Sequence, residues 1–150
     1  MKELITLVAR LVVVVAIVGC GGAGGTVSPT GTPAGSPTAS VAVTLGEFSV
    51  TPSPAGAAAG PVTFQVTNSG ALEHEFVVLG PTELAPDQLP SADGGLTVDE
   101  AAVGVAAELE GIPAGSGATL DTPLSSGSYV LICNIETHWQ SGMRAAFTVP

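Results

Sequence analysis

Three chemically distinctive side chains are grouped near the C-terminus of this 150-residue chain. Cys133, His138 and Met143 follow one another with four residues between each pair, in CNIETHWQSGM. The other histidine, His74, stands alone in mid-chain, and the only other cysteine and methionine lie within the first twenty residues. Thiolate, imidazole and thioether groups are ligands of soft and borderline metal ions. The grouping therefore favours a fold that brings His74 to the 133–143 segment and closes one metal site.

The first nineteen residues have the features of a secretory leader. A charged start precedes an apolar run over 11–18 that is too short to span a bilayer. The run leads into Ile-Val-Gly-Cys, which resembles the lipobox of bacterial lipoproteins, whose cysteine is acylated and becomes the first residue of the mature protein. We predict a signal peptide over 1–19 and a lipidated Cys20. The alternative is an uncleaved anchor with an incidental cysteine, and either version tethers the domain to the membrane outside the cytoplasm.

Residues 20–40 have the composition of a linker. After Cys20 the segment contains Gly, Ser, Thr, Pro and Ala, with Val27 as its only larger apolar residue, so it cannot bury enough surface to fold. We predict a disordered tether, followed by a single domain over 41–150. With Cys20 lipidated, Cys133 has no disulfide partner in an oxidising compartment, and a metal is the natural occupant of a lone thiol there.

The chain is strongly acidic, with 3 basic and 13 acidic residues and a formal net charge of −10. Two of the basic residues, Lys2 and Arg10, belong to the predicted leader. This balance excludes nucleic-acid binding through a basic footprint and favours a partner with a basic or cationic surface. Solubility outside the cytoplasm is the alternative reason for most of the carboxylates. We expect a monomer.

From residue 41 onward, short β-prone segments alternate with glycine and proline, which predicts an all-β sandwich or barrel. Every second residue is apolar in the segment that begins at His74 and in the segment that ends at Cys133, so a candidate ligand lies at one end of each inward face. The turn signal Asn68-Ser69-Gly70 would return the His74 strand across the sheet. The predicted strands are 41–45, 47–51, 61–67, 74–79, 119–122, 128–133 and 144–149.

The region 81–117 is the least typical of a sandwich. Thr97 followed by Glu100 is the pattern of a capping box and predicts a short helix through Ala102. Gly104 would interrupt this helix, and 105–109 is a further candidate strand. The sequence assigns no role to this region.

Two imidazoles, one thiolate and a weak axial thioether form the ligand set of blue-copper electron-transfer sites. Such a site holds one compromise geometry for both oxidation states, so little rearrangement accompanies electron transfer. Three ligands on one loop would be held against a rigid scaffold, and we expect the fourth, from another strand, to lock the two sheets together. Zinc is the alternative metal, but a closed zinc site takes four strong ligands and methionine is not a usual one.

Two segments resemble cupredoxins of the plastocyanin and azurin type. Cys133-x4-His138-x4-Met143, preceded by the strand Tyr-Val-Leu-Ile and followed by a final strand, is similar to the copper loop of that family. NSGALEHEFVV is similar to its Asn, Gly and His segment, and the resemblance extends over 41–150. It implies a Greek-key β-sandwich or barrel with one type 1 copper ion. By the same resemblance His74, Cys133 and His138 are equatorial ligands and Met143 is the axial one.

Each of these residues also has an ordinary structural interpretation. A histidine at the start of a strand is commonly a surface or hydrogen-bonded residue, methionine fills gaps in cores, and a buried cysteine is commonly inert. One site explains the joint spacing better than three coincidences. A binuclear centre would need a second loop cysteine, and a multicopper oxidase or nitrite reductase would need further histidines. We therefore predict that the chain is not an enzyme by itself.

Two residues next to the predicted ligands, Glu75 and Trp139, bear on the properties of the predicted copper site. Many cupredoxins have, after the first histidine, an asparagine that helps to pin the copper loop, whereas this chain has Glu75. Together with Glu73 and Glu136, Glu75 would lower the reduction potential if the carboxylates lie near the copper, which charge-neutral substitutions would test.

Trp139 follows His138, whose counterpart in related proteins emerges through an apolar docking patch. Trp139 is thus a candidate docking residue, or else a ring packed over the loop to exclude water.

The sequence predicts a membrane-tethered protein that shuttles single electrons between extracytoplasmic redox partners through one type 1 copper ion. His138 is the candidate exit for the electron. A copper carrier or buffer without electron transfer is the second hypothesis. A β-sandwich with a vestigial site is the third.

Overall fold

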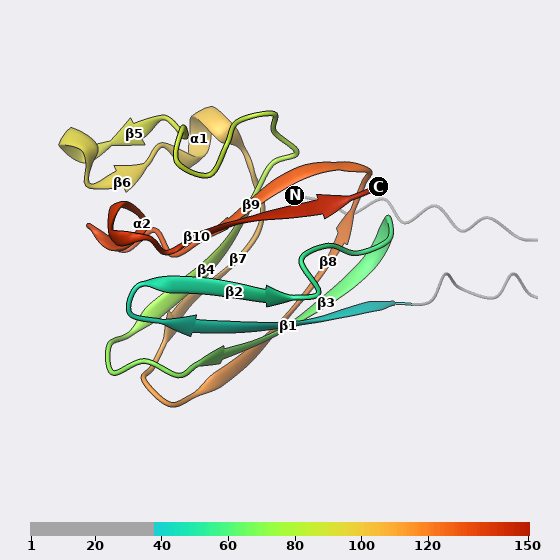
Figure 1. Ribbon diagram of the computed structural model, residues 1–150, viewed down its shortest axis with the longest axis horizontal. Helices are drawn as coiled ribbons and strands as arrows, with labels where there is room; N and C mark the ends of the chain where they lie inside the picture. Colours follow the sequence, from blue (N-terminus) through green and yellow to red (C-terminus); the bar gives the residue numbers. More distant parts are fainter. Residues whose placement is uncertain (1–37) are drawn as a thin grey trace, which may run out of the picture. The chain divides into compact units, whose positions relative to one another are not determined.

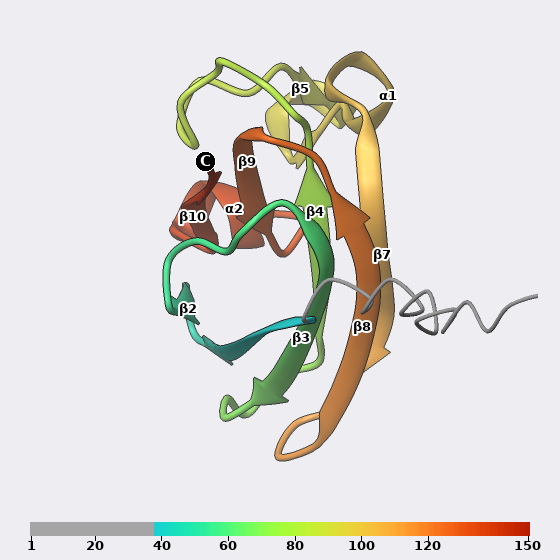
Figure 2. The same ribbon diagram turned by 90° about the vertical axis from the view of Figure 1, so that its right-hand side faces the viewer.

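The computed structural model describes residues 38–150 (Figure 1). The predicted signal peptide, the predicted lipidation of Cys20 and nearly all of the predicted tether lie outside the described residues. Within residues 38–150, no helix has the length and apolar character that crossing a membrane requires. These residues form two four-stranded sheets that face each other, with a small two-stranded ribbon beside one of them (Figures 1 and 2).

The first sheet contains β1 (Ala39–Gly46), β2 (Ser49–Ser53), β3 (Gly60–Asn68) and β8 (Gly117–Leu124). Its strand order is β2-β1-β3-β8, with β1 and β3 parallel and the outer pairs antiparallel. Burial alternates along β1, where Val41, Val43 and Leu45 face inward. This is the period-2 pattern of a sheet with one solvated face.

The second sheet contains β4 (His74–Leu79), β7 (Val105–Ile112), β9 (Gly127–Ile132) and β10 (Arg144–Val149). Its order is β10-β9-β4-β7, and all of its pairs are antiparallel. The chain passes from one sheet to the other between β3 and β4, between β7 and β8 and between β8 and β9, which are Greek-key connections. The predicted all-β sandwich is confirmed.

The sheet to which each strand belongs overturns two expectations. The turn at Asn68–Gly70 carries the chain from the first sheet to the second rather than back across one sheet. His74 begins β4 and Cys133 directly follows β9, and these two strands are neighbours in the second sheet. The prediction that the mid-chain ligand would lock the two sheets together is therefore wrong, because the residues from both segments belong to the same sheet.

The space between the sheets is filled by one apolar core with three phenylalanines at its centre. The ring of Phe64 lies 5.3 Å from that of Phe76 and 5.4 Å from that of Phe147, in tilted and edge-to-face arrangements. All three are fully or almost fully buried. Because Phe64 comes from the first sheet and the other two from the second, this contact joins the layers.

A second apolar cluster covers the other face of β4 and β9. It includes Val77, Leu79, Val130 and Ile132, packed beneath Leu89, Val98 and Trp139. The covering segment contains β5 (Ser91–Ala92), the 3-10 turn η1 (Asp93–Gly95), β6 (Thr97–Val98) and α1 (Glu100–Val103). Both faces of the two central strands are thus buried, which explains their uninterrupted apolar runs and gives the region after residue 81 a structural role.

The predicted strands are found with shifted ends. β4 and β10 have the predicted bounds, whereas β1 begins two residues early and β9 ends one residue before Cys133. The predicted 47–51 strand is displaced to Ser49–Ser53, because Glu47 and Phe48 form the turn of the β1–β2 hairpin. β2 accommodates Pro52 since it is an edge strand.

The predicted capping box is wrong in its cap residue. Thr97 and Val98 pair with Ser91 and Ala92 as the β5–β6 ribbon, so Thr97 is unavailable as a cap. The side chain of Asp99 instead accepts a hydrogen bond from Ala102 N, and the helix spans Glu100–Val103.

We predict that Phe64→Ala destabilises the copper-free protein by about 3–5 kcal/mol, because it leaves a cavity where the two layers meet. Equilibrium unfolding in urea measures this loss. Phe48→Ala is the matched control, since Phe48 is 43% exposed, and should cost at most about 1 kcal/mol. Equal losses for the two variants would contradict the assigned core.

Candidate metal centre

The four predicted ligands lie at the ends of three neighbouring strands of the second sheet, β4, β9 and β10, or in the loop between β9 and β10. His74 is the first residue of β4, and Cys133 directly follows β9. His138 begins the one-turn helix α2 (His138–Ser141), which the sequence analysis did not predict, and Met143 directly precedes β10. Since β4 lies between β9 and β7, the start of β4 is brought to the loop that joins β9 to β10.

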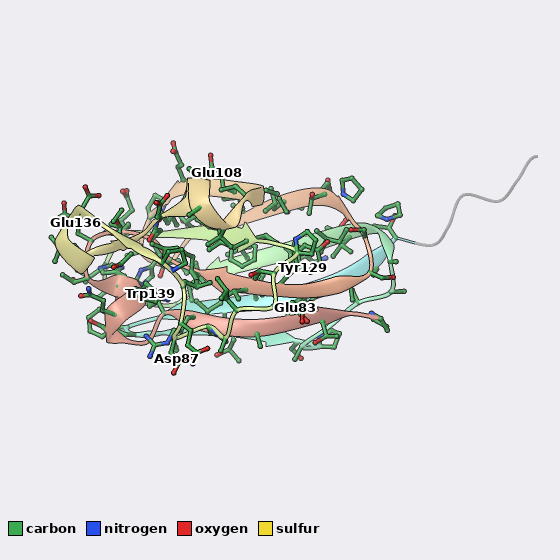
Figure 3. The ribbon with its side chains drawn as sticks, turned by 90° about the horizontal axis from the view of Figure 1, so that it is seen from above. Glu83, Asp87, Glu108, Tyr129, Glu136 and Trp139 are labelled. Atoms are coloured by element: carbon green, nitrogen blue, oxygen red, sulfur yellow. The ribbon has the colours of Figure 1, made fainter. Side chains whose placement is uncertain are left out.

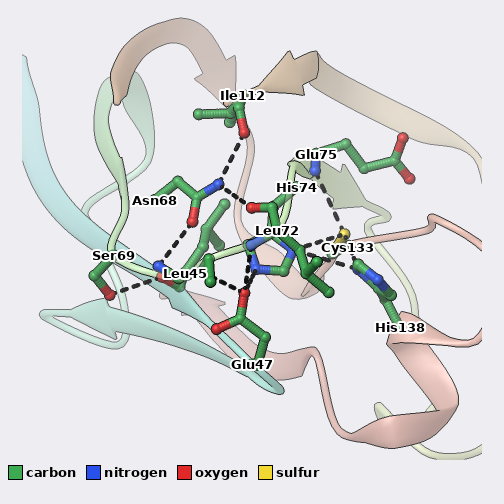
Figure 4. A network of polar contacts seen from close by, with 12 residues as sticks. Leu45, Glu47, Asn68, Ser69, Leu72, His74, Glu75, Ile112, Cys133 and His138 are labelled. Carbon is green, nitrogen blue, oxygen red and sulfur yellow. Dashed lines mark hydrogen bonds and ion pairs between the residues drawn. The ribbon is translucent and has the colours of Figure 1, made fainter. Parts of the chain in front are cut away.

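Three donor atoms converge at this end of the sheet (Figure 4). Cys133 Sγ lies 3.4 Å from His138 Nδ1 and 3.8 Å from His74 Nδ1, and the two Nδ1 atoms are 3.3 Å apart. His74 and Cys133 are fully buried, whereas His138 is 8% exposed. The site is therefore closed except at the edge of His138.

The donor set fits a single metal ion. A trigonal ion bonded about 2.0–2.3 Å from imidazole nitrogen and thiolate sulfur requires donors roughly 3.5–3.7 Å apart. The three donor–donor distances, 3.3, 3.4 and 3.8 Å, lie just below and just above this range. Both histidines present the same atom, Nδ1. Imidazole and thiolate together with a nearby methionine are the donors of a type 1 copper site.

Backbone hydrogen bonds close the loop that carries three of the ligands. Cys133 N donates to Met143 O at 3.1 Å, which joins the two ends of the loop. Met143 N donates to His138 O at 3.1 Å, and Thr137 N donates to Leu96 O at 2.9 Å. Met143 itself is fully buried in the same core cluster as Cys133. All four residues are thus positioned for a type 1 copper site.

Burial also sets the protonation of the donors. Burial raises the pKa of the Cys133 thiol, and the Glu75 N–H, 3.4 Å from Sγ, offsets part of this rise. A thiolate at neutral pH therefore requires the positive charge of a metal ion. Burial lowers the pKa of His138, and the proximity of His74 lowers it further. This favours the neutral imidazole, which is the form that binds metals.

Glu75 contacts the site through its backbone. Its N–H points at Cys133 Sγ, while its carboxylate is directed away from the sulfur (Figure 4). Burial, helped by the charges of Glu100, Glu110 and Glu108, raises the pKa of the Glu75 carboxyl, although a hydrogen bond from the Asn134 backbone N–H opposes this rise. The side chain that stands in place of the family's asparagine therefore lies among other carboxylates and also contacts the backbone of the copper loop at Asn134.

Asn134 anchors the loop, and the sequence analysis did not single it out. Its Oδ1 accepts from Val98 N at 2.7 Å, and its Nδ2 donates to Val98 O and to Glu100 Oε1 at 3.1 and 2.7 Å. These bonds tie the residue after Cys133 to β6 and α1. The position of Asn134 next to Cys133 could have indicated this role. Its partners, Val98 and Glu100, lie in the 81–117 region, to which the sequence assigned no role.

Asn68 holds the approach to His74. It is fully buried, and its Nδ2 donates to Leu72 O and Ile112 O, both at 2.8 Å, while Oδ1 accepts from Gly70 N at 2.9 Å (Figure 4). The sequence predicts the turn but not this role of Asn68. A buried amide with all three bonds made fixes the path of the chain from β3 to β4.

Glu47 is a further residue that sequence reasoning missed. Its Oε1 accepts hydrogen bonds from Ala71 N and Leu72 N, both at 2.8 Å, and lies 3.4 Å from His74 Nε2. The Leu72 N–H contributes most to lowering the pKa of the Glu47 carboxyl, although burial opposes it. By contrast, Glu73 and Glu136 are exposed.

Trp139 is largely buried beside the copper loop. The side chain, labelled in Figure 3, is 8% exposed and belongs to the second apolar cluster, and its Nε1 donates a hydrogen bond to Pro86 O at 2.9 Å. The guanidinium of Arg144 lies 5.7 Å from the ring centroid. The segment after residue 81 covers most of the ring, and the docking role of Trp139 stays a prediction. The alternative, a packed ring, describes its place beside the copper loop.

The fold and the donor set define a class of protein. A Greek-key sandwich that presents a buried His-Cys-His triangle, with a methionine at the end of the same loop, is a cupredoxin. The family model described as the sulfocyanin (SoxE) domain matches residues 43–150. The chain belongs to this family. No curated protein sequence matches the chain significantly.

Solved structures that are similar to this chain share little sequence identity with it. Auracyanin B is 15% identical over 79% of this chain and 92% of its own, with a TM-score of 0.52. The copper protein rusticyanin is 20% identical over 75% of this chain and 78% of its own, with a TM-score of 0.51. A reduced auracyanin from the photosynthetic bacterium Roseiflexus castenholzii is 21% identical over 78% and 99%, with a TM-score of 0.49. The predicted resemblance to cupredoxins is confirmed.

We predict that Asn68→Ala destabilises the copper-free protein by about 2–4 kcal/mol and weakens copper binding, because buried backbone groups lose their partner and the approach to His74 loosens. Urea unfolding and copper titration measure the two effects. Gln65→Ala removes an exposed amide from the same strand and should change stability by no more than about 0.5 kcal/mol. An Asn68→Ala protein as stable as this control would refute the assigned role.

Proposed function

We propose that this protein is a type 1 copper electron carrier tethered to the membrane outside the cytoplasm. The observation that carries the proposal is the triangle of Cys133 Sγ and two Nδ1 atoms, buried and already assembled by the scaffold. His74, Cys133 and His138 would be the equatorial ligands and Met143 the axial one. Bound copper supplies a one-electron couple.

The surrounding residues support electron transfer rather than substrate chemistry. His74 and Cys133 are fully buried, and the loop is closed by its own backbone bonds, so the ligands move little when the charge changes. His138 is the ligand with a solvent-accessible edge and is our candidate exit for the electron. Phe48, 43% exposed and edge-to-face with His138 at 5.6 Å, is the aromatic neighbour on that side. We assign no catalytic role to the chain by itself.

The proposed partners are redox proteins with basic docking surfaces. The net charge of −10 supports this choice. Burial contributes most to raising the pKa of Glu75, and the charges of Glu100, Glu110 and Glu108 add to this rise, so negative charge gathers around the residue that follows His74. Such a field increases the rate of encounter with a cationic partner, and this rate should fall with rising salt concentration.

The proposed location rests on the N-terminal sequence. The Ile-Val-Gly-Cys segment supports cleavage before Cys20 and its lipidation. A lipid anchor would hold the copper domain near the membrane, where the low-complexity segment up to residue 38 would serve as a tether. A protein at that position would exchange electrons with partners at the membrane surface.

We predict that the copper(II)-loaded protein has an intense thiolate absorption band in the visible range and a narrow copper hyperfine splitting, both lost in Cys133→Ser. The serine variant keeps the size of the side chain but removes the thiolate that the band requires. Visible absorption, electron spin resonance and reversible reduction check the prediction.

Cys20→Ser is the matched control for the same experiment. It should keep the colour, because residue 20 lies outside the metal centre, and it should release the protein from the membrane fraction of the host. A colourless wild type that binds cuprous ion and resists oxidation would favour the copper carrier. Failure to bind copper would support the third hypothesis, a β-sandwich whose metal site is vestigial. Membrane retention of Cys20→Ser would contradict the lipid anchor.

A further inference from the structure

The two ring nitrogens of His74 have different surroundings. Nδ1 faces Cys133 Sγ and His138 Nδ1 in the metal centre. Nε2 is buried, has no hydrogen-bond partner among residues 38–150, and lies 3.4 Å from Glu47 Oε1. A neutral imidazole carries one N–H, so a ligating Nδ1 leaves the hydrogen on Nε2. The buried Nε2–H requires an acceptor, and the carboxylate of Glu47 is beside it.

Glu47 is held in place by contacts that do not depend on His74. It lies in the turn between β1 and β2, in the first sheet, and its Oε1 accepts from Ala71 N and Leu72 N at 2.8 Å. Its carboxylate also occupies the space that a side chain at Gly70 would need, because a Cβ built there collides with it. The carboxylate therefore bridges the β1–β2 hairpin to the segment that leads into β4.

Other carboxylates near the ligands in sequence do not have this relation to the site. Glu73 and Glu136 are exposed, and Glu75 contacts Cys133 through its backbone N–H. Among the described residues, Glu47 is the one whose carboxylate lies within ion-pair distance of a histidine. Its side chain is 28% exposed while the imidazole that it faces is fully buried, so the interaction is only partly screened by water.

We propose that Glu47 is a positioning residue for His74, which accepts the Nε2–H, holds Nδ1 toward the metal centre and stabilises the oxidised copper site. This inference rests on the proposed function. A carboxylate that accepts the outer N–H of a ligating histidine fixes the ring and raises the donor strength of its other nitrogen. Stronger donation favours the more highly charged cupric ion over the cuprous ion.

We predict that Glu47→Gln weakens binding of cupric ion by about 10–100-fold and changes cuprous binding much less. The reduction potential should then rise by about 59 mV for each tenfold loss of cupric affinity. Glutamine keeps an oxygen that can accept from Ala71 N and Leu72 N, so the turn should fold as in the wild type. Copper titration and redox titration measure both quantities, and an unchanged potential would overturn the proposal.

Glu73→Gln is the control for charge alone, since it removes the same charge from an exposed residue next to His74 in the chain. It should raise the potential much less than Glu47→Gln. Equal shifts in the two variants would show that net charge, not the contact with Nε2, sets the potential. That outcome would also overturn the proposal.

Nitrogen-15 NMR of the copper-free protein tests the contact without relying on copper. The hydrogen of His74 should reside on Nε2 in the wild type, and its resonance should shift and exchange faster with water in Glu47→Gln. A hydrogen on Nδ1, or an Nε2–H resonance unaffected by the substitution, would overturn the proposal. A wild type without the thiolate band would overturn the proposed function instead, and the NMR result would still decide the role of Glu47.

Discussion

The antiparallel pairing of β4 with β9 is the interaction on which the metal centre depends. It places His74 beside Cys133 although 59 positions separate them in the chain. The register pairs Val78 with Leu131, and both strands are buried on both faces. A slip of β9 by one residue would turn Cys133 away from the inter-sheet core and away from His74. The two apolar clusters therefore fix the register as well as the fold.

Polar side chains fix the segments that carry the predicted ligands, in addition to the strand pairing. Asn68, Asn134 and Glu47 each bind backbone groups of another segment, and each acts next to one predicted ligand. Their bonds link the β3–β4 turn, the loop after β9 and the β1–β2 hairpin to one end of the sandwich. Because these contacts are made by the protein alone, the donor triangle is held rather than assembled by the metal. This is the arrangement in which a change of oxidation state requires the least rearrangement.

Local patterns predicted the strands and the ligand loop, because alternation and the Cys-x4-His-x4-Met spacing can be recognised within a few residues. The sheet to which β4 belongs could not be predicted, since it depends on pairing with strands far along the chain. The burial of Trp139 likewise depends on Leu89 and Val98, in a region whose residues are individually uninformative. Glu47 gave no local signal, because its partners lie 24 and 25 positions away. Long-range polar contacts of this kind decide the surroundings of a site and leave little trace in sequence spacing.

The central claim is that the scaffold holds the copper ligands in place before copper binds. Crystal structures of the copper-free and copper-loaded protein test it most directly. We predict that His74 Nδ1, Cys133 Sγ and His138 Nδ1 occupy the same positions in both forms to within about 0.5 Å, with one copper ion between them. A copper-free structure in which a histidine is rotated out of the site, or in which the 134–142 loop is rearranged, would contradict the account.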